Sequence, residues 1–136
     1  MDLIAGSFST FPSFVAYFLS GGFLLTAFVL LYVYSTPYPE FALIRSGNTA
    51  AALVMGGALL GFVIPLSSVI ANSGSLVDLL LWGGIALIIQ LLGLWIAKRV
   101  IPGLSDAIRA GTISDAIFVA SLSLALGILD AACMVG

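Results

Sequence analysis

Long, uninterrupted runs of apolar residues dominate this chain. Four runs, each of about 20 residues or more, cover positions 13–34, 48–71, 78–97 and 112–134. At about 1.5 Å of rise per residue, a helix of that length is roughly 30 Å long and matches the hydrocarbon thickness of a bilayer. The pattern predicts an all-α membrane protein in which four transmembrane helices form a single domain over residues 1–136.

Polar positions are concentrated in two loops, 35–47 and 98–111. In each loop a proline, Pro39 or Pro102, precedes a short stretch whose apolar residues lie three or four positions apart. This spacing predicts a short amphipathic helix along the membrane interface in each loop. The apolar residues concerned are Phe41 and Ile44 in the first loop and Leu104 and Ile108 in the second.

The two halves of the chain repeat each other at a shift of 64 residues. The shift aligns "IRSGNTAAALVMGGALLG" at 44–61 with "IRAGTISDAIFVASLSLA" at 108–125, so that Ile-Arg-x-Gly recurs and small residues fall on small residues. Each copy, about 12–72 and about 76–136, holds two spans, so both copies share one orientation. We therefore expect a tandem duplicated helix pair whose halves are related by a parallel pseudo-twofold axis along the membrane normal.

Charge is scarce, and its placement predicts the topology. Only 7% of the residues are charged and 62% are hydrophobic, whereas about a quarter of a soluble domain is charged. Four basic residues are too few to favour nucleic-acid binding, and all of them lie in the two loops. By the positive-inside rule we expect both loops in the cytoplasm and both termini outside. The basic residues are Arg45, Lys98, Arg99 and Arg109.

The N-terminal stretch resembles a signal peptide only in being apolar. It carries Asp2 and no Lys or Arg before the first span, so the positively charged region of a signal peptide is missing. We expect this segment to be retained.

Several kinds of chemistry are disfavoured by the residue types present. Histidine is absent and Cys133 is the single cysteine, which excludes an intramolecular disulfide and the usual His/Cys metal sites. A serine nucleophile would lack its histidine base, and no pair of carboxylates falls at one depth for acid–base work. We therefore expect no enzymatic activity, no metal and no cofactor.

Small residues predict where helices approach each other closely. Gly57-x-x-x-Gly61 lies on one face of the second span, and its mate in the repeat is Ser121-x-x-x-Ala125. This spacing permits close contact between helix backbones. We expect these residues to pack helices within the fold, with a homodimer face as the alternative.

A proline inside the second span predicts a polar pocket. Pro65 removes the hydrogen bond to the Gly61 carbonyl, so the helix should kink or open, and the freed carbonyl needs a partner such as Ser67, Ser68 or a neighbouring helix. The repeat places Asp130 at the same depth, and a carboxylate in a span usually faces a bundle interior or water. Together these residues predict an outward-open pocket suited to a cation or a proton.

The same residues also have structural explanations. Pro65 and the serines would only shape the second helix, and Asp130 would only reach the outer headgroups, since six residues follow it. Near mid-membrane the repeat aligns Thr26 with Gln90, and Gln90 would then be an interhelical hydrogen-bond donor rather than part of a permeation pathway. Both alternatives stay open at this point.

Four stretches resemble the YjfL-like bacterial inner-membrane proteins, the domain-of-unknown-function 350 or uncharacterised-protein-family 0719 group. They are "NTAAAL" (48–53), "GALLGFVIPLSS" (57–68), "WGGIALIIQLL" (82–92) and "DAACM" (130–134). The resemblance implies a multi-pass inner-membrane protein built from a tandem two-helix domain, with a suspected link to envelope stress. It also implies Asn as an alternative at Asp130, which argues against a mechanism that needs an ionised carboxylate.

Two functions remain in view. The first, which we favour, is a non-catalytic component of the membrane that forms a homo-oligomer or recruits a cytoplasmic protein partner, through the small-residue faces and the segments around Phe41 and Leu104. The alternative is a small channel or transporter for an ion, a proton or a solute, which also requires an oligomer because four helices are too few for a roomy pore. The residues of that pathway would be Asp130, Ser67, Ser68, Gln90 and Thr26.

Overall fold

The computed structural model describes residues 9–72 and 75–135, and every element in this part of the chain is a helix. The helices are α2 (Phe11–Ser35), α3 (Glu40–Arg45), α4 (Thr49–Asn72), α5 (Leu76–Val100), α6 (Leu104–Arg109) and α7 (Ile113–Val135). The long helices α2, α4, α5 and α7 are each long and apolar enough to cross a membrane. The prediction of an all-α protein with four spans is confirmed.

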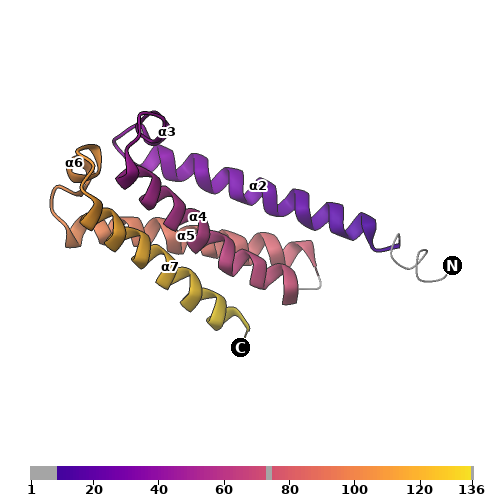
Figure 1. The fold of residues 1–136 in the computed structure, drawn as a ribbon. Helices are drawn as coiled ribbons and strands as arrows, with labels where there is room; N and C mark the ends of the chain where they lie inside the picture. The colour runs from indigo at the N-terminus through magenta and orange to yellow at the C-terminus, as the bar shows by residue number, and fades with distance from the viewer. Residues whose placement is uncertain (1–8, 73–74, 136) are drawn as a thin grey trace.

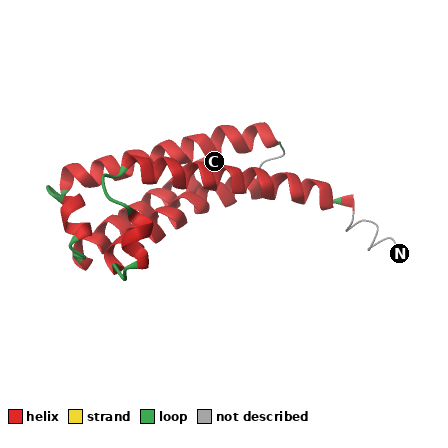
Figure 2. Cartoon of the chain, turned by 90° about the horizontal axis from the view of Figure 1, so that it is seen from above, coloured by secondary structure: helices red, strands yellow, loops and turns green. Residues whose placement is uncertain are grey.

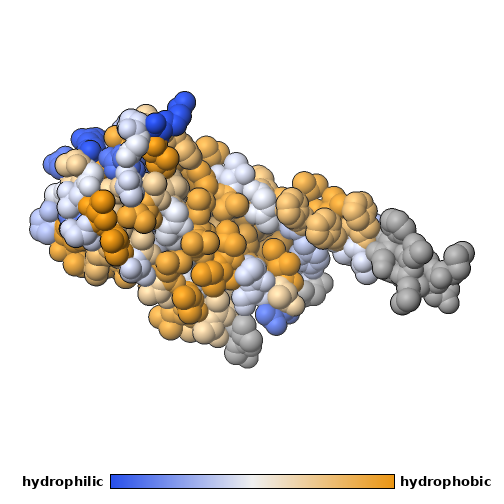
Figure 3. All heavy atoms as spheres, viewed as in Figure 1, coloured by the Kyte–Doolittle hydropathy of each residue, from blue (hydrophilic) through white to orange (hydrophobic). Residues whose placement is uncertain are grey.

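The long helices form an elongated bundle, and the short helices α3 and α6 lie together at one of its ends (Figure 1, Figure 2). Hydrophilic surface gathers at that same end, whereas apolar surface covers the length of the bundle (Figure 3). Both basic loops therefore lie on one side, as their charge predicts. Their assignment to the cytoplasm stays a prediction, and the expectation for Asp2 and the N-terminal segment lies outside the described residues.

The most extensive helix contact joins α4 to α7. A Cβ atom added at Gly57 would come within 3.0 Å of the Ala120 backbone, and one added at Gly61 would come equally close to the Ser123 backbone. Glycine at these two positions thus allows two helix backbones to meet, which is how small residues drive association in lipid. The structure places Gly57 and Gly61 at the tight contact that their spacing predicts.

The residues that α7 contributes to this contact are not the expected ones. Ala120, Ser123 and Gly127, three and four positions apart, face α4, whereas Ser121 and Ala125 are exposed. Each residue turns a helix by about 100°, so a shift of one or two positions moves a side chain off the contact face. The expectation that Ser121 and Ala125 pack within the fold is therefore wrong, and the homodimer alternative stays a prediction.

Helix α2 is attached through an aromatic cluster. Phe28 is fully buried and stacks on Phe62 of α4, with ring centroids 4.6 Å apart. Tyr32, one turn further along α2, lies 5.6 Å from Phe28 by the same measure and is also buried. Most other large side chains of α2 are exposed on the bundle surface, where a lipid-facing helix carries apolar residues.

The short helices face the bundle more than we expected. In α6 both Leu104 and Ile108 are buried against the long helices, so neither is available to lipid or to a protein partner. In α3, Phe41 is half exposed while Ile44 is partly buried. The expected interfacial face at Leu104 and Ile108 is thus wrong, because these side chains fill the end of the bundle core.

The Asn48 side chain connects the end of α6 to the start of α4. Its Oδ1 accepts a hydrogen bond from the backbone N–H of Ala51 at 3.0 Å and so caps α4, while its Nδ2 donates to the carbonyl of Ile108 at 2.9 Å. One side chain therefore satisfies the start of α4 and the end of α6, where backbone groups lack partners inside their own helices.

Candidate functional site

Helix α4 continues without a break across Pro65. The Gly61 carbonyl, which loses its hydrogen bond to the proline, lies against Gly127 of α7, where an added Cβ would come within 3.0 Å of the carbonyl oxygen. A neighbouring helix thus covers the freed carbonyl, which is one of the partners we considered. The expected opening of the helix does not occur, and the tight α4–α7 contact at Gly57 and Gly61 lies just before Pro65.

Two members of the expected pocket face outward. Ser67 is exposed and its hydroxyl donates to the Ile64 carbonyl at 2.8 Å, while the Thr26 hydroxyl donates to the Gly22 carbonyl at 2.9 Å on the exposed side of α2. Bonds of this kind let hydroxyl groups sit in lipid without another partner. Neither residue belongs to a pocket with Asp130, so their assignment to one is wrong.

Gln90 lies in the core between α5 and α7. It is 2% exposed, and its Nε2 donates to the Ser123 carbonyl at 3.0 Å. Its Oε1 is buried and has no hydrogen-bond partner among the described residues. Gln90 also borders Gly61, where an added Cβ would come within 3.0 Å of Nε2. This geometry is that of an interhelical hydrogen bond, the structural alternative for Gln90.

A small cavity of about 130 Å³ opens at the end of the bundle opposite α3 and α6. Ser68 lies in its wall, and the acidic group there is Asp78 of α5 rather than Asp130. The lining residues are Ser68, Val69, Asn72, Asp78, Trp82 and Met134.

Asp130 lies on α7, three residues beyond Gly127. Its side chain is partly buried, and Oδ2 is enclosed without a hydrogen-bond partner among the described residues. The single pocket expected from the sequence does not form, since Gly61 and Gln90 lie in the core and Ser68 lines the cavity at the end of the bundle opposite α3 and α6. Within the described ranges, no group of three or more His, Cys, Asp or Glu side chains is placed to hold a metal ion.

The least expected polar group is Glu40, the first residue of α3. Glu40 is the only glutamate in the chain and is 1% exposed, and neither carboxyl oxygen has a hydrogen-bond partner in the described part of the chain. The nearby Thr36 hydroxyl donates to the Val33 carbonyl at 3.1 Å instead. Buried carboxyl groups without partners are rare, because burial penalises the ionised form strongly.

Two tyrosines surround this carboxyl group. Tyr32 is 1% exposed and its hydroxyl has no partner among the described residues, and Tyr38 is buried as well. Burial raises the pKa of Glu40 above its ordinary value of 4.5, and the charge of the nearby Lys98 offsets only part of this effect. Burial, reinforced by the Glu40 carboxylate, raises the pKa of Tyr38 to about 12.

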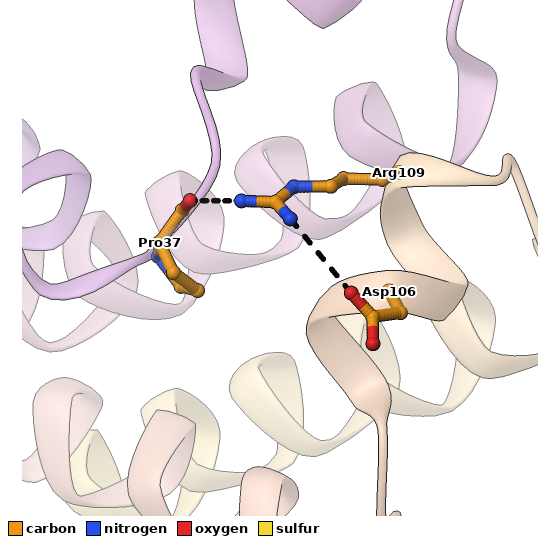
Figure 4. A network of polar contacts seen from close by, with 3 residues as sticks. All are labelled: Pro37, Asp106 and Arg109. Carbon is orange, nitrogen blue, oxygen red and sulfur yellow. Dashed lines mark hydrogen bonds and ion pairs between the residues drawn. The ribbon is translucent and has the colours of Figure 1, made fainter.

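Basic residues hold the loop that carries this group. The Lys98 ammonium donates to the Ser35 carbonyl at 2.9 Å. Arg109 of α6 donates to the Pro37 carbonyl and lies 3.7 Å from Asp106 (Figure 4). The other two basic residues lie at the surface, Arg99 over the Trp95 ring at 5.0 Å and Arg45 exposed in the last turn of α3.

A sequence signal for Glu40 exists but is weak. Positions 40, 43 and 44 share one face of a helix, and Leu43 and Ile44 are partly buried with Glu40. We expected Phe41 and Ile44 instead to form the apolar face of this helix, lying along the membrane interface. An isolated glutamate among tyrosines, on the same face as two aliphatic residues, is the pattern that would have indicated it.

Comparison with known proteins agrees with this architecture. The family described as Domain of Unknown Function (DUF350) matches residues 6–134. The chain is 43% identical over 122 residues to the "UPF0719 inner membrane protein YjfL" of Escherichia coli strain K12, covering 90% of this chain and 92% of that protein, and equally so to its counterpart in Escherichia coli O157:H7. No solved structure matches significantly. The relatives and the four apolar helices indicate a multi-pass inner-membrane protein. The chain belongs to the DUF350 family.

Proposed function

We propose that this chain is a non-catalytic component of the bacterial inner membrane that works as a homo-oligomer. The observation that carries the proposal is the outward face of α7. Ser121 and Ala125 lie there one turn apart and exposed, while the opposite face of the helix packs against α4. A hydroxymethyl and a methyl group in place of long side chains let a helix of a second copy approach closely. We propose that this component acts in the response of the cell envelope to stress, the suspected role of the family.

A tandem duplication is part of the same proposal. The helices α3 and α6 each have six residues and begin at Glu40 and Leu104, positions that the shift of 64 aligns. Gly47 and Gly111, also aligned, both have positive φ, 94° and 82°. Each ends the connection from a short helix to the next span, where only glycine adopts this conformation without strain. These correspondences support a pseudo-twofold arrangement.

We propose that a cytoplasmic protein partner binds at the exposed side chain of Phe41. It is 50% exposed on α3, at the hydrophilic end of the bundle (Figure 3). Leu104 is buried, so α6 has no equivalent surface.

Cross-linking in native membranes tests the oligomer. With Cys133 changed to Ser, we expect Ser121→Cys to form a covalent dimer under mild oxidation, because α7 of two copies would meet at this position. The matched control is Phe23→Cys, an exposed position on α2 that we place toward lipid. Equal or absent dimer formation at both positions would count against the α7 interface.

Permeation is the second candidate, favoured by the enclosed, unpartnered Oδ2 of Asp130. An oligomer that brought several Asp130 side chains together would create a polar path near the outer face. We expect no proton or monovalent-cation flux in proteoliposomes containing the purified protein. Flux that Asp130→Asn abolishes and Ser67→Ala leaves unchanged would reverse the order of the two candidates.

A further inference from the structure

In the proposed repeat, the position that corresponds to Glu40 is occupied by Leu104. Leu104 begins α6 as Glu40 begins α3, and both side chains are buried, at 5% and 1% exposure. The same chain thus fills one of these two positions with an aliphatic residue. A carboxyl group at the other position adds a desolvation cost that leucine does not have, so its presence calls for a reason other than packing.

The charged and titratable groups around Glu40 do not neutralise it by an ion pair. Tyr32 approaches from α2 and Tyr38 from the preceding loop, and Lys98 of α5 lies close enough for its charge to act on the carboxyl. The Lys98 ammonium, however, is bonded to the Ser35 carbonyl. From α6, Arg109 reaches the loop at Pro37 while close to Asp106, and the packed helix α4 contains no titratable residue.

A proton fits this environment better than a metal ion does. Lys98 already supplies positive charge nearby, and a bound metal would need space and several oxygen ligands around it. A proton needs no space, and it turns one carboxyl oxygen into a hydrogen-bond donor. The nearby Tyr32 hydroxyl is buried and has no partner among the described residues either, so it does not offset the cost of burying a carboxylate.

We propose that Glu40 is a proton-binding site that fastens α3 to the bundle. While α3 is docked, the carboxyl group is protonated and buried beside Tyr32. When its O–H bond breaks, the proton passes to water on the side of the two loops, and the remaining carboxylate favours release of the segment 36–47 into solvent. The loop position is thereby linked to the pH of that compartment, which we expect to be the cytoplasm.

The direction of this linkage follows from the raised pKa of Glu40. The docked form binds the proton more tightly than the released form, so docking is fully favoured below the ordinary pKa of 4.5 and is lost as pH rises through the docked pKa. Since one proton is involved, the docking equilibrium changes by at most about tenfold per pH unit.

Infrared spectroscopy combined with hydrogen exchange tests the proposal. In protein reconstituted in lipid, the carboxylic-acid C=O band is compared between the wild type and Glu40→Gln, and amide exchange of segment 36–47 is followed over the same pH series after correction for intrinsic rates. We expect an acid band that Glu40→Gln removes, with a midpoint above pH 4.5. Exchange of the segment should rise as the band disappears, and Glu40→Gln should keep exchange slow at all pH values.

Matched variants make the result decisive. Asp78→Asn changes an exposed carboxylate at the opposite end of the bundle from α3, and it should leave both the band and the exchange profile unchanged. Glu40→Leu copies the residue at Leu104 and should give a folded protein whose α3 stays docked at every pH. A missing Glu40 band above pH 4.5, or a band that titrates without any change in exchange of 36–47, would overturn the proposal.

Discussion

Replacing Gly127 with alanine is expected to lower the free energy of unfolding by about 3 kcal/mol, the upper part of the range for overpacked positions. The added methyl group would come within 3.0 Å of the carbonyl oxygen, carbonyl carbon and Cα of Gly61. These are backbone atoms and cannot move aside as a flexible side chain does. Helices α4 and α7 would have to separate along their most extensive contact.

Gly56→Ala is the matched control for this experiment. It makes the same change inside α4, where an added Cβ has nothing within 4 Å. Both substitutions gain the helix propensity of alanine, about 1 kcal/mol, so Gly56→Ala should be neutral or stabilising. Reversible unfolding in mixed detergent micelles gives both values. Similar stabilities for the two variants would show that α4 and α7 do not meet at Gly127.

Phe28→Ala is expected to lower the free energy of unfolding by about 3 kcal/mol, near the lower limit for replacing a buried aromatic ring with alanine and leaving a cavity. Phe28 is fully buried and stacks on Phe62, so its removal takes away dispersion contacts and an aromatic pair together. Because this stack fastens α2 to the bundle, α2 should also exchange its amide hydrogens faster than α4 or α7.

The corresponding control is Phe23→Ala in the same helix. Phe23 is 67% exposed, and in a bilayer its ring exchanges protein contacts for very similar contacts with lipid. We expect a change in unfolding free energy within about 0.5 kcal/mol, as for other exposed positions. If Phe23→Ala were as costly as Phe28→Ala, α2 would be turned the other way in the membrane.

The features that the sequence predicts well depend on local pattern. Apolar length alone identifies the four spans, because every backbone group in a lipid-embedded segment must be satisfied inside a helix. A proline followed by apolar residues three or four positions apart indicates each of the short helices α3 and α6. Gly57 and Gly61 lie at a helix contact, as their four-residue spacing on one face of the span predicts.

The features that the sequence does not predict depend on how each helix is rotated about its own axis, and so on which of its residues face a neighbouring helix. Ser121 and Ala125 have the spacing of a packing motif, yet α7 meets α4 through the residues beside them. Thr26 and Ser67 satisfy their hydroxyl groups within their own helices, so polarity alone does not place them in a pocket. Glu40 is hidden by tertiary docking of α3, which no local pattern specifies.

The central claim is that the chain works as a homo-oligomer. It is tested by measuring the mass of the complex released directly from native membranes together with its surrounding lipid. The account predicts a complex of two or more copies of the chain for the wild type, and single copies for Ser121→Leu, whose bulkier side chain would prevent close approach of α7. A wild-type protein found only as single copies, under release conditions that keep a known inner-membrane oligomer intact, would contradict the proposed function.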